Sequence, residues 1–360
     1  MEIVIRGMSV LSSAGAGAIG LCEQSLNDVS FLTKFDLRKL ETEISAFEKG
    51  PHELTRIQKL ILLAFLRASR SAGLTEDSIA SNQTAIFLGN SYGLEEFKSG
   101  FFSLYKKSDP ALTSPTLFPF TTANALAAWL AIQTGAKGPN TTFVNGSNSS
   151  AEAILAACDA LSNDECETAF VGGVNLLDKD LNNEFCVSGF RNECVAMVVL
   201  QRFNKETCSS NQSTFCITNW QREKLSNEEL KKIKYERSIL SISEKEQNLQ
   251  ANEIIHLGNN LGDQVFSYNK DEIDINARHR VFSYSDVVGN VFDASGALGV
   301  ALSVECLAAE QNGRCSFFDT KSDRIFYSNV DSTGTTISML ISNQTIPLTI
   351  DCHVEKSARI

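Results

Sequence analysis

The sequence lacks any apolar run that approaches the roughly 18 residues needed to cross a bilayer. Its first residues, MEIVIRGMSVLSS, are typical of a β-strand rather than a signal peptide. Basic residues are also scarce, since 32 lysines and arginines stand against 43 aspartates and glutamates, giving a formal net charge of -11. Such a chain repels phosphate backbones and anionic lipids. These features predict a cytoplasmic protein that binds neither nucleic acid nor a membrane.

Metal-site spacings are missing as well. The ten cysteines form no CxxC or CxH pattern, which predicts buried free thiols and neither a metal site, a cofactor nor a disulfide framework. Only four histidines occur, and His52, His279 and His353 lie in polar or terminal segments. With His256 they do not form a Ser-His-Asp order.

Short β-rich runs alternate with helical segments, which predicts an α/β fold with a covered, parallel or mixed sheet. The expected strands of the first half are residues 2–8, 84–88, 141–144, 169–172 and 194–200, and those of the second half are 214–219, 252–256, 280–284, 324–329 and 336–341. Two sets of five suggest an internal duplication with halves 1–203 and 204–360. The second half is the shorter one, and its polar stretch 204–250 is the expected exposed cap and junction.

Four helices are expected. The segment 54–71 is amphipathic and stops near Gly73, whereas 121–134, 149–161 and 294–311 are alanine-rich and nearly uncharged. Alanine-rich helices without charges are typical of helices packed on all sides.

Candidate chemistry concentrates in GPNTTFVNGSNSSAEAILAACDAL. An expected strand, an Asn145-Gly146 turn and a helix from about Ser149 place Ser147 at a strand-to-helix elbow. Backbone N–H groups and the helix dipole at such a point favour developing negative charge. Serines and asparagines before a helix are also ordinary N-caps, and the pattern alone fits both interpretations.

The same passage resembles the nucleophile region of β-ketoacyl synthases. Gly138-Pro139, the strand, the elbow and then Gly172-Gly173 follow in the order of that family, and its cysteine position falls on Ser147. The segments IVIRGMSVLSSAG, IFLGNSYG, RNE before CVAMVVLQR, and VVGNVFDASGALGVALSVECL resemble other parts of the family. The resemblance covers most of the chain and is weakest between about 204 and 280. It implies a thiolase-like, five-layer αβαβα fold made of two pseudo-duplicated halves.

The resemblance also implies a degenerate site. Active members use a cysteine thiolate, two histidines and a lysine, and here the second histidine position holds Asn290 and the lysine position holds Ser285. His256 is the candidate for the first histidine, although its spacing to Asp263 is one residue short. The family's glycine-rich loop is replaced by residues 329–334, in which Thr333 and Gly334 would take the oxyanion-type positions.

A serine without an adjacent base is a weak nucleophile. We therefore predict no catalytic residue among the degenerate positions Ser147, His256, Ser285 and Asn290. Within the family this description resembles a chain-length factor, the non-condensing subunit of type II polyketide or aryl polyene synthases. The expected partner is an active ketosynthase in a heterodimer. Acyl carrier proteins are acidic, so they are expected to dock mainly on that partner rather than on this acidic chain.

In such pairs the growing chain lies in a tunnel at the dimer interface, and the helix at 121–134 is the expected interface helix. The candidate tunnel and interface residues are Phe118, Phe120, Ala125, Ala128 and Trp129. Core packing explains the same residues equally well.

Two other functions stay open. The first is a Ser147-dependent acyltransferase or hydrolase that acts on carrier-protein thioesters, with His256 as its base. The second is an inert structural paralogue without a tunnel.

Overall fold

The computed structural model describes residues 2–12, 15–17, 54–91, 94–107, 115, 117–176, 193–203, 214–224, 254–259, 280–283, 291–311, 324–331 and 335–344. Within these ranges one mixed, 11-stranded sheet runs through the molecule in the order β4-β3-β5-β6-β1-β7-β11-β10-β8-β9, with β2 paired to β1. The strands are β1 (Ile3–Ser12), β2 (Gly15–Ala16), β3 (Thr84–Gly89), β4 (Asn140–Phe143), β5 (Thr168–Asn175), β6 (Cys194–Arg202), β7 (Thr214–Lys224), β8 (Ile254–Asn259), β9 (Arg280–Ser283), β10 (Arg324–Val330) and β11 (Thr335–Gln344). Every strand predicted from the sequence is present.

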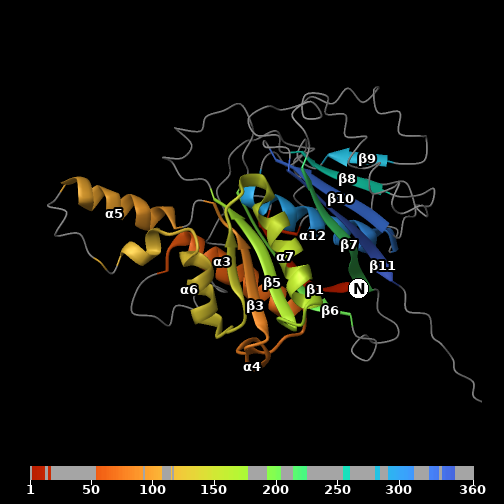
Figure 1. Ribbon diagram of the computed structural model, residues 1–360, viewed down its shortest axis with the longest axis horizontal. Helices are drawn as coiled ribbons and strands as arrows, with labels where there is room; N and C mark the ends of the chain where they lie inside the picture. Colours follow the sequence, from red (N-terminus) through yellow and green to blue (C-terminus); the bar gives the residue numbers. More distant parts are fainter. Residues whose placement is uncertain are drawn as a thin grey trace, which may run out of the picture.

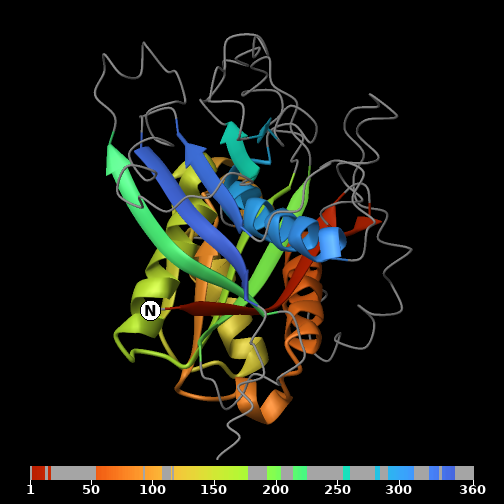
Figure 2. The same ribbon diagram turned by 90° about the vertical axis from the view of Figure 1, so that its right-hand side faces the viewer.

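The strand order repeats between the two parts of the sheet. Counted along the chain without the short β2, each set runs third, second, fourth, fifth, first from its outer edge to the middle. The two sets meet where β1 pairs antiparallel with β7, with Ile3 opposite Ile217. Figure 2 shows the long strands β7 and β11 side by side. The expected internal duplication is therefore visible in the sheet, and the boundary at residues 203 and 204 stays a prediction.

The helices of the described part are α3 (Arg56–Ser71), α4 (Glu76–Ile79), α5 (Glu95–Lys107), α6 (Ala125–Thr134), α7 (Ser149–Ser162) and α12 (Ser295–Gln311), with 3₁₀ turns η4 (Phe118–Thr121), η5 (Gly146–Asn148) and η6 (Phe292–Ala294). The sequence predicts α3 closely because Thr55 and Gln58 form a capping box, in which Thr55 N donates to Gln58 Oε1 at 3.0 Å. The helices α4 and α5 are not predicted.

The layers follow from which helices pack on which strands. Helices α3 and α6 cover one face of the first half of the sheet, and α7 and α12 pack together on the other. Helix α12 also packs against β10 and β8, so α7 and α12 lie between the two halves of the sheet (Figure 1). One buried apolar cluster surrounds α7 and α12, and a second lies under α3 and α6. These layers belong to the α/β class with helices on both faces of a mixed sheet.

Helix α6 differs from its prediction in two ways. It begins at Ala125 rather than Thr121, because the Thr121 and Thr122 hydroxyls bond back to the Phe118 and Pro119 carbonyl oxygens and close a separate turn. It is also not packed on all sides, since Ile132 is 77% exposed. By contrast, the expected burial holds for most of α7.

The structure also bears on the predictions about the cysteines and about membrane-spanning segments. Among the described residues, the cysteines at 158, 166, 194, 216 and 306 are buried and form no disulfide, and burial raises the pKa of the Cys194 thiol to about 12. No helix of the described ranges is long and apolar enough to cross a membrane. Of the expected cap at 204–250, β7 is described as a strand of the sheet, and residues 204–213 and 225–250 lie outside the described ones.

Candidate functional site

The elbow that joins β4 to α7 has the predicted form. After Phe143 the chain turns through η5 into α7, and Ser147 is 6% exposed. Gly146 has a φ of 53°, and a Cβ at this position would lie 3.3 Å from Cζ of Phe292. Glycine is therefore required at Gly146 both by its backbone angle and by the aromatic ring beside it.

The polar cluster at the elbow does not act as an ordinary helix cap. Asn148, the N-cap residue of α7, makes no side-chain capping bond. Instead, the Asn145 backbone N–H donates to Ser149 Oγ at 2.9 Å, and Ser149 Oγ donates to the Gly146 carbonyl at 2.7 Å. The side chains of the cluster thus fix the elbow backbone rather than the free N–H groups of the helix.

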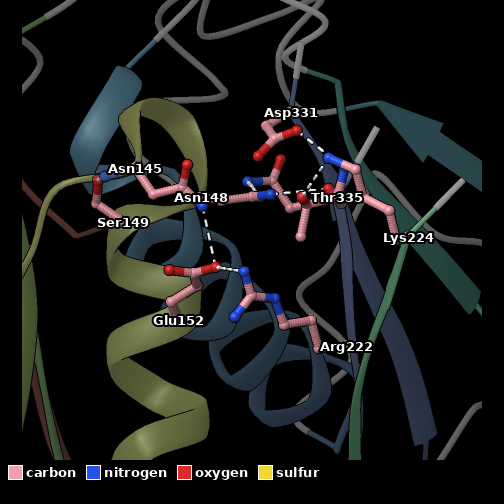
Figure 3. A network of polar contacts seen from close by, with 9 residues as sticks. Asn145, Asn148, Ser149, Glu152, Arg222, Lys224, Asp331 and Thr335 are labelled. Atoms are coloured by element: carbon pink, nitrogen blue, oxygen red, sulfur yellow. Dashed lines mark hydrogen bonds and ion pairs between the residues drawn. The ribbon is translucent and has the colours of Figure 1, made fainter. Parts of the chain in front are cut away.

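Side chains of the second half of the sheet hold the elbow from one side (Figure 3). Asn329 Nδ2 donates to the Ser147 carbonyl at 2.8 Å and to Asn148 Oδ1 at 2.9 Å. Asn148 Nδ2 in turn donates to the Thr335 carbonyl at 2.8 Å, and Thr335 N donates to Asp331 Oδ1 at 2.9 Å. Because these amides are buried, their bonds are costly to break, and they tie the elbow to β10 and β11.

An outer part of this network reaches β7 (Figure 3). Asn145 Nδ2 donates to Glu152 Oε1 at 2.9 Å, and the Arg222 guanidinium lies 3.0 Å from the same oxygen. Lys224 Nζ lies 3.4 Å from Thr335 Oγ1. The Arg222 side chain is 60% exposed, so its ion pair contributes little to stability and chiefly orients Glu152 toward Asn145.

A carboxyl that the sequence analysis missed lies on the other side of the elbow. Asp293 is fully buried on η6 and accepts hydrogen bonds from Ser91 N at 2.8 Å and Ser91 Oγ at 2.6 Å. Burial raises the pKa of Asp293 to about 6, against the opposing effect of hydrogen bonds from Ser149 and Ser91. The signal in the sequence is the single acidic residue within VVGNVFDASGALG.

These groups limit the chemistry of the elbow. The side chains described around it include hydroxyls, amides, carboxyls, the Arg222 guanidinium and the Lys224 ammonium group, and among them Asp293 has its pKa raised toward neutrality. Its carboxyl accepts both the Ser91 backbone N–H and the Ser91 hydroxyl proton. A serine hydroxyl becomes a useful nucleophile only beside a base that takes its proton.

Several predicted site residues lie outside the described ones, namely Ser285, Asn290, Thr333 and Gly334. For His256 only the backbone is described. It lies in β8, opposite Tyr327 of β10 and Phe282 of β9. The role of each of these residues stays a prediction.

The predicted tunnel residues do not form one group. Phe118 on η4 is 58% exposed, and Ala128 on α6 is also exposed. Ala125 is buried, Trp129 packs partly buried against the cluster under α6, and the ring of Phe120 stacks on Phe97 with centroids 5.0 Å apart. The exposed pair faces solvent and the others pack inside, so the two kinds of position would serve different roles.

Part of the chain is similar to a known protein family. Residues 27–186 match the family model of the β-ketoacyl synthase N-terminal domain. The chain is 31% identical over 120 residues to the highly reducing polyketide synthase dmxL2 of Cryptosporiopsis sp. (strain 8999), which covers 33% of this chain and 5% of that protein. The chain thus spans only a small part of the curated polyketide synthase it matches.

Several solved structures superpose on nearly the whole chain. The solved structure of AntDE:AntF, a type II PKS acyl-carrier protein in complex with its ketosynthase, contains a chain that superposes with a TM-score of 0.73 at 16% identity, covering 95% of this chain and 99% of that one. The ishigamide ketosynthase/chain length factor gives a TM-score of 0.69 at 16% identity with the same coverage. The chain therefore has the thiolase-like fold of ketosynthases, and residues 27–186 resemble the β-ketoacyl synthase N-terminal domain.

Proposed function

We propose that this chain is a non-condensing, ketosynthase-like subunit, a chain-length factor that pairs with an active β-ketoacyl synthase. In this role it shapes the tunnel for a growing polyketide or polyene chain. The observation that carries the proposal is the hydroxyl of Ser147 at the point of the fold where the resemblance expects a thiol. A hydroxyl has no accessible anion near neutral pH, whereas a thiol at a helix N-terminus ionises readily.

A second observation supports pairing. Strand β4 forms one edge of the sheet in the described part of the chain, and its Asn140 and Thr141 are exposed. Large apolar side chains are exposed near this edge. They are Val144 (58% exposed), directly after β4, Ile132 (77%) on α6, Phe118 (58%) on η4 and Phe102 (53%) on α5. An open strand edge flanked by exposed apolar groups is a surface that proteins usually cover.

Helix α5 adds to this surface. Figure 1 shows it extending away from the body of the molecule, beyond α6. It contacts η4, where the Phe101 and Phe118 rings lie 6.0 Å apart. A projecting helix with exposed aromatic side chains is suited to bind a partner subunit.

The comparisons support the same proposal by analogy. One solved structure with this fold is the ishigamide ketosynthase/chain length factor, and another is a type II PKS acyl-carrier protein in complex with its ketosynthase. We infer that the carrier protein docks mainly on the partner, since this chain has a net charge of -11. A cytoplasmic location, without membrane or nucleic acid as partners, remains part of the proposal.

The experiment that tests the missing nucleophile uses acyl transfer. The full chain is incubated with an acyl-loaded carrier protein and its intact mass is measured, with Ser147→Ala as the baseline and Ser147→Cys as the matched positive control. The natural chain is expected to gain no acyl group, and Ser147→Cys is expected to gain one because a thiolate can exchange with the thioester.

An acyl adduct on the natural chain that disappears in Ser147→Ala would overturn the non-condensing role. It would establish the second candidate, a Ser147-dependent acyltransferase or hydrolase. Release of free acid without a stable adduct, again lost in Ser147→Ala, would favour the hydrolase.

A further inference from the structure

The buried carboxyl of Asp293 connects two segments that lie 202 residues apart in the sequence. Asp293 lies on η6, immediately before α12, and Ser91 follows the end of β3. Both carboxylate oxygens are used, since Oδ2 accepts from Ser91 N at 2.8 Å and Oδ1 accepts from Ser91 Oγ at 2.6 Å. A two-point bond of this kind fixes both the position and the rotation of the serine.

Ser91 passes this constraint to the elbow. Its hydroxyl has one proton, which goes to Asp293, so its oxygen is left as an acceptor and takes the Gly146 N–H at 3.2 Å. The Ser91 and Ser149 hydroxyl oxygens lie 3.3 Å apart, and Ser149 itself bonds to Asn145 and Gly146. These bonds therefore end on the backbone of Asn145 and Gly146, immediately before Ser147.

We propose that Asp293 is the positioning residue of the elbow, and that it holds the backbone before Ser147 in place through Ser91 across the boundary between the two halves of the sheet. The proposal goes beyond the pairing function and does not depend on it. A chain that lost its partner would keep this arrangement.

The backbone just before Asp293 supports the proposal. Phe292 has a φ of 44°, a left-handed conformation that a bulky residue adopts only when its surroundings force it. This turn directs the Phe292 ring against Gly146 while Asp293, the next residue, reaches Ser91. Two adjacent side chains of η6 therefore constrain the same turn of the elbow. Phe292 packs beside Gly146, and Asp293 acts on it through Ser91.

Among the described residues, few charged side chains lie on the elements that pack around Asp293. The elements packed against η6 are β5, η5, α7, α12 and β6, and the described ionisable side chains on them are Cys158, Glu152 and Asp159 of α7, Glu305 and Cys306 of α12, and Cys194 and Arg202 of β6. Glu152 bonds to Asn145 and Arg222, Asp159 accepts from the Trp220 indole, and Arg202 pairs with Asp164. The pKa of Asp293 is raised by burial rather than by any of these charges.

The test is the hydrogen exchange rate of the Gly146 amide in the full chain, measured relative to amides of β5 and β6. Asp293→Ala and Ser91→Ala each remove one link, and each is expected to lower Gly146 protection at least about tenfold, the loss expected when a buried polar group loses its hydrogen-bond partner. Glu193→Gln is the matched control. It removes another buried carboxylate, the partner of Arg56, and is expected to leave the relative protection of Gly146 unchanged.

A pH profile separates positioning from a merely structural role. Opening the elbow hydrates Asp293 and returns its pKa toward 3.8, so ionisation favours opening. After correction for intrinsic exchange, Gly146 protection is therefore expected to fall, by up to about 100-fold, as the pH rises from about 4 to about 7. Asp293→Asn, which does not titrate, is expected to lose this dependence.

The proposal is overturned if Gly146 protection stays within about twofold of the natural chain in Ser91→Ala, or if Asp293→Asn keeps the natural pH dependence. Should Asp293→Ala fail to fold, Ser91→Ala and Asp293→Asn still decide the question.

Discussion

Among single residues, Asp293 makes the stability of the folded chain depend on pH. Its folded-state pKa of about 6 lies above the ordinary 3.8, so between these values the folded state binds more protons than the unfolded state. The contribution of Asp293 to the free energy of unfolding is therefore largest below pH 4 and declines by about 3 kcal/mol as the pH rises through 6.

Urea denaturation of the natural chain and of Asp293→Asn at a series of pH values measures this contribution. The difference in unfolding free energy between the two proteins should change between pH about 4 and 7 and be constant above it. A constant difference over the whole range would show that Asp293 has an ordinary pKa in the folded protein.

A second buried carboxylate, Glu193, is paired with an arginine that is less buried than it is. Arg56 donates two hydrogen bonds of 2.7 Å to Glu193 and so joins the start of α3 to the chain before β6. The Glu193 side chain is fully buried, whereas that of Arg56 is 22% exposed and can regain water. Removing the arginine therefore takes the ion-pair partner from the more deeply buried of the two charges, which is the more costly loss.

We expect Arg56→Met to lower the unfolding free energy by about 3–5 kcal/mol, and Glu193→Gln to lower it by less. Chemical denaturation of both variants gives the comparison. The opposite ranking would mean that the two charges are desolvated to a similar extent.

At this scale the sequence predicts some of the site. Ser147 is found because the strand, turn and helix around it are local patterns. Asp293, Ser91 and Asn329 are missed as partners of the elbow, because their contacts join residues distant in the chain and no local periodicity records them.

Among the elements, the close contact of β3 with α7 determines where the elbow lies. A Cβ added to Gly89, the last residue of β3, would lie 2.5 Å from Ser150 N in the first turn of α7. Strand and helix can approach this closely only because Gly89 has no side chain.

Gly89→Ala should therefore push α7 away from β3 and lower the unfolding free energy by about 1–3 kcal/mol. Gly100→Ala on α5 is the matched control, because a Cβ there meets nothing within 4 Å. That control should be neutral or stabilise the chain by up to about 1 kcal/mol. Thermal or urea unfolding distinguishes the two, and equal effects would contradict the contact.

The elements themselves are predictable to different degrees. Strands are found because apolar runs of β-branched residues stand between polar turns. Helix α5 is missed because its aromatic side chains face outward in part and pack mainly on η4, so it has no clear buried stripe. The start of α6 is misplaced because Thr121 and Thr122 close their own turn.

For the whole molecule, the repeated strand order leaves β4 at one outer edge and β9 at the other. The exposed apolar groups of Ile132 and Val144 lie beside the β4 edge. The proposed pairing therefore assigns this edge to the partner.

Ile132→Asp and Val144→Asp should each weaken association with a co-expressed ketosynthase at least about tenfold, since each places a charge in an apolar interface. Asn163→Asp, an exposed change at the other end of α7, serves as the control and should have no effect. Affinity is measured by titration of the purified chains. Unchanged affinity in both interface variants would remove this edge from the proposal.

The most direct measurement of the central claim is the molar mass in solution of the purified chain, alone and together with a ketosynthase that retains its cysteine. Pairing predicts a stable one-to-one complex in the mixture, and a chain that aggregates or stays weakly associated when alone. A stable, soluble homodimer that takes up no ketosynthase would contradict the account.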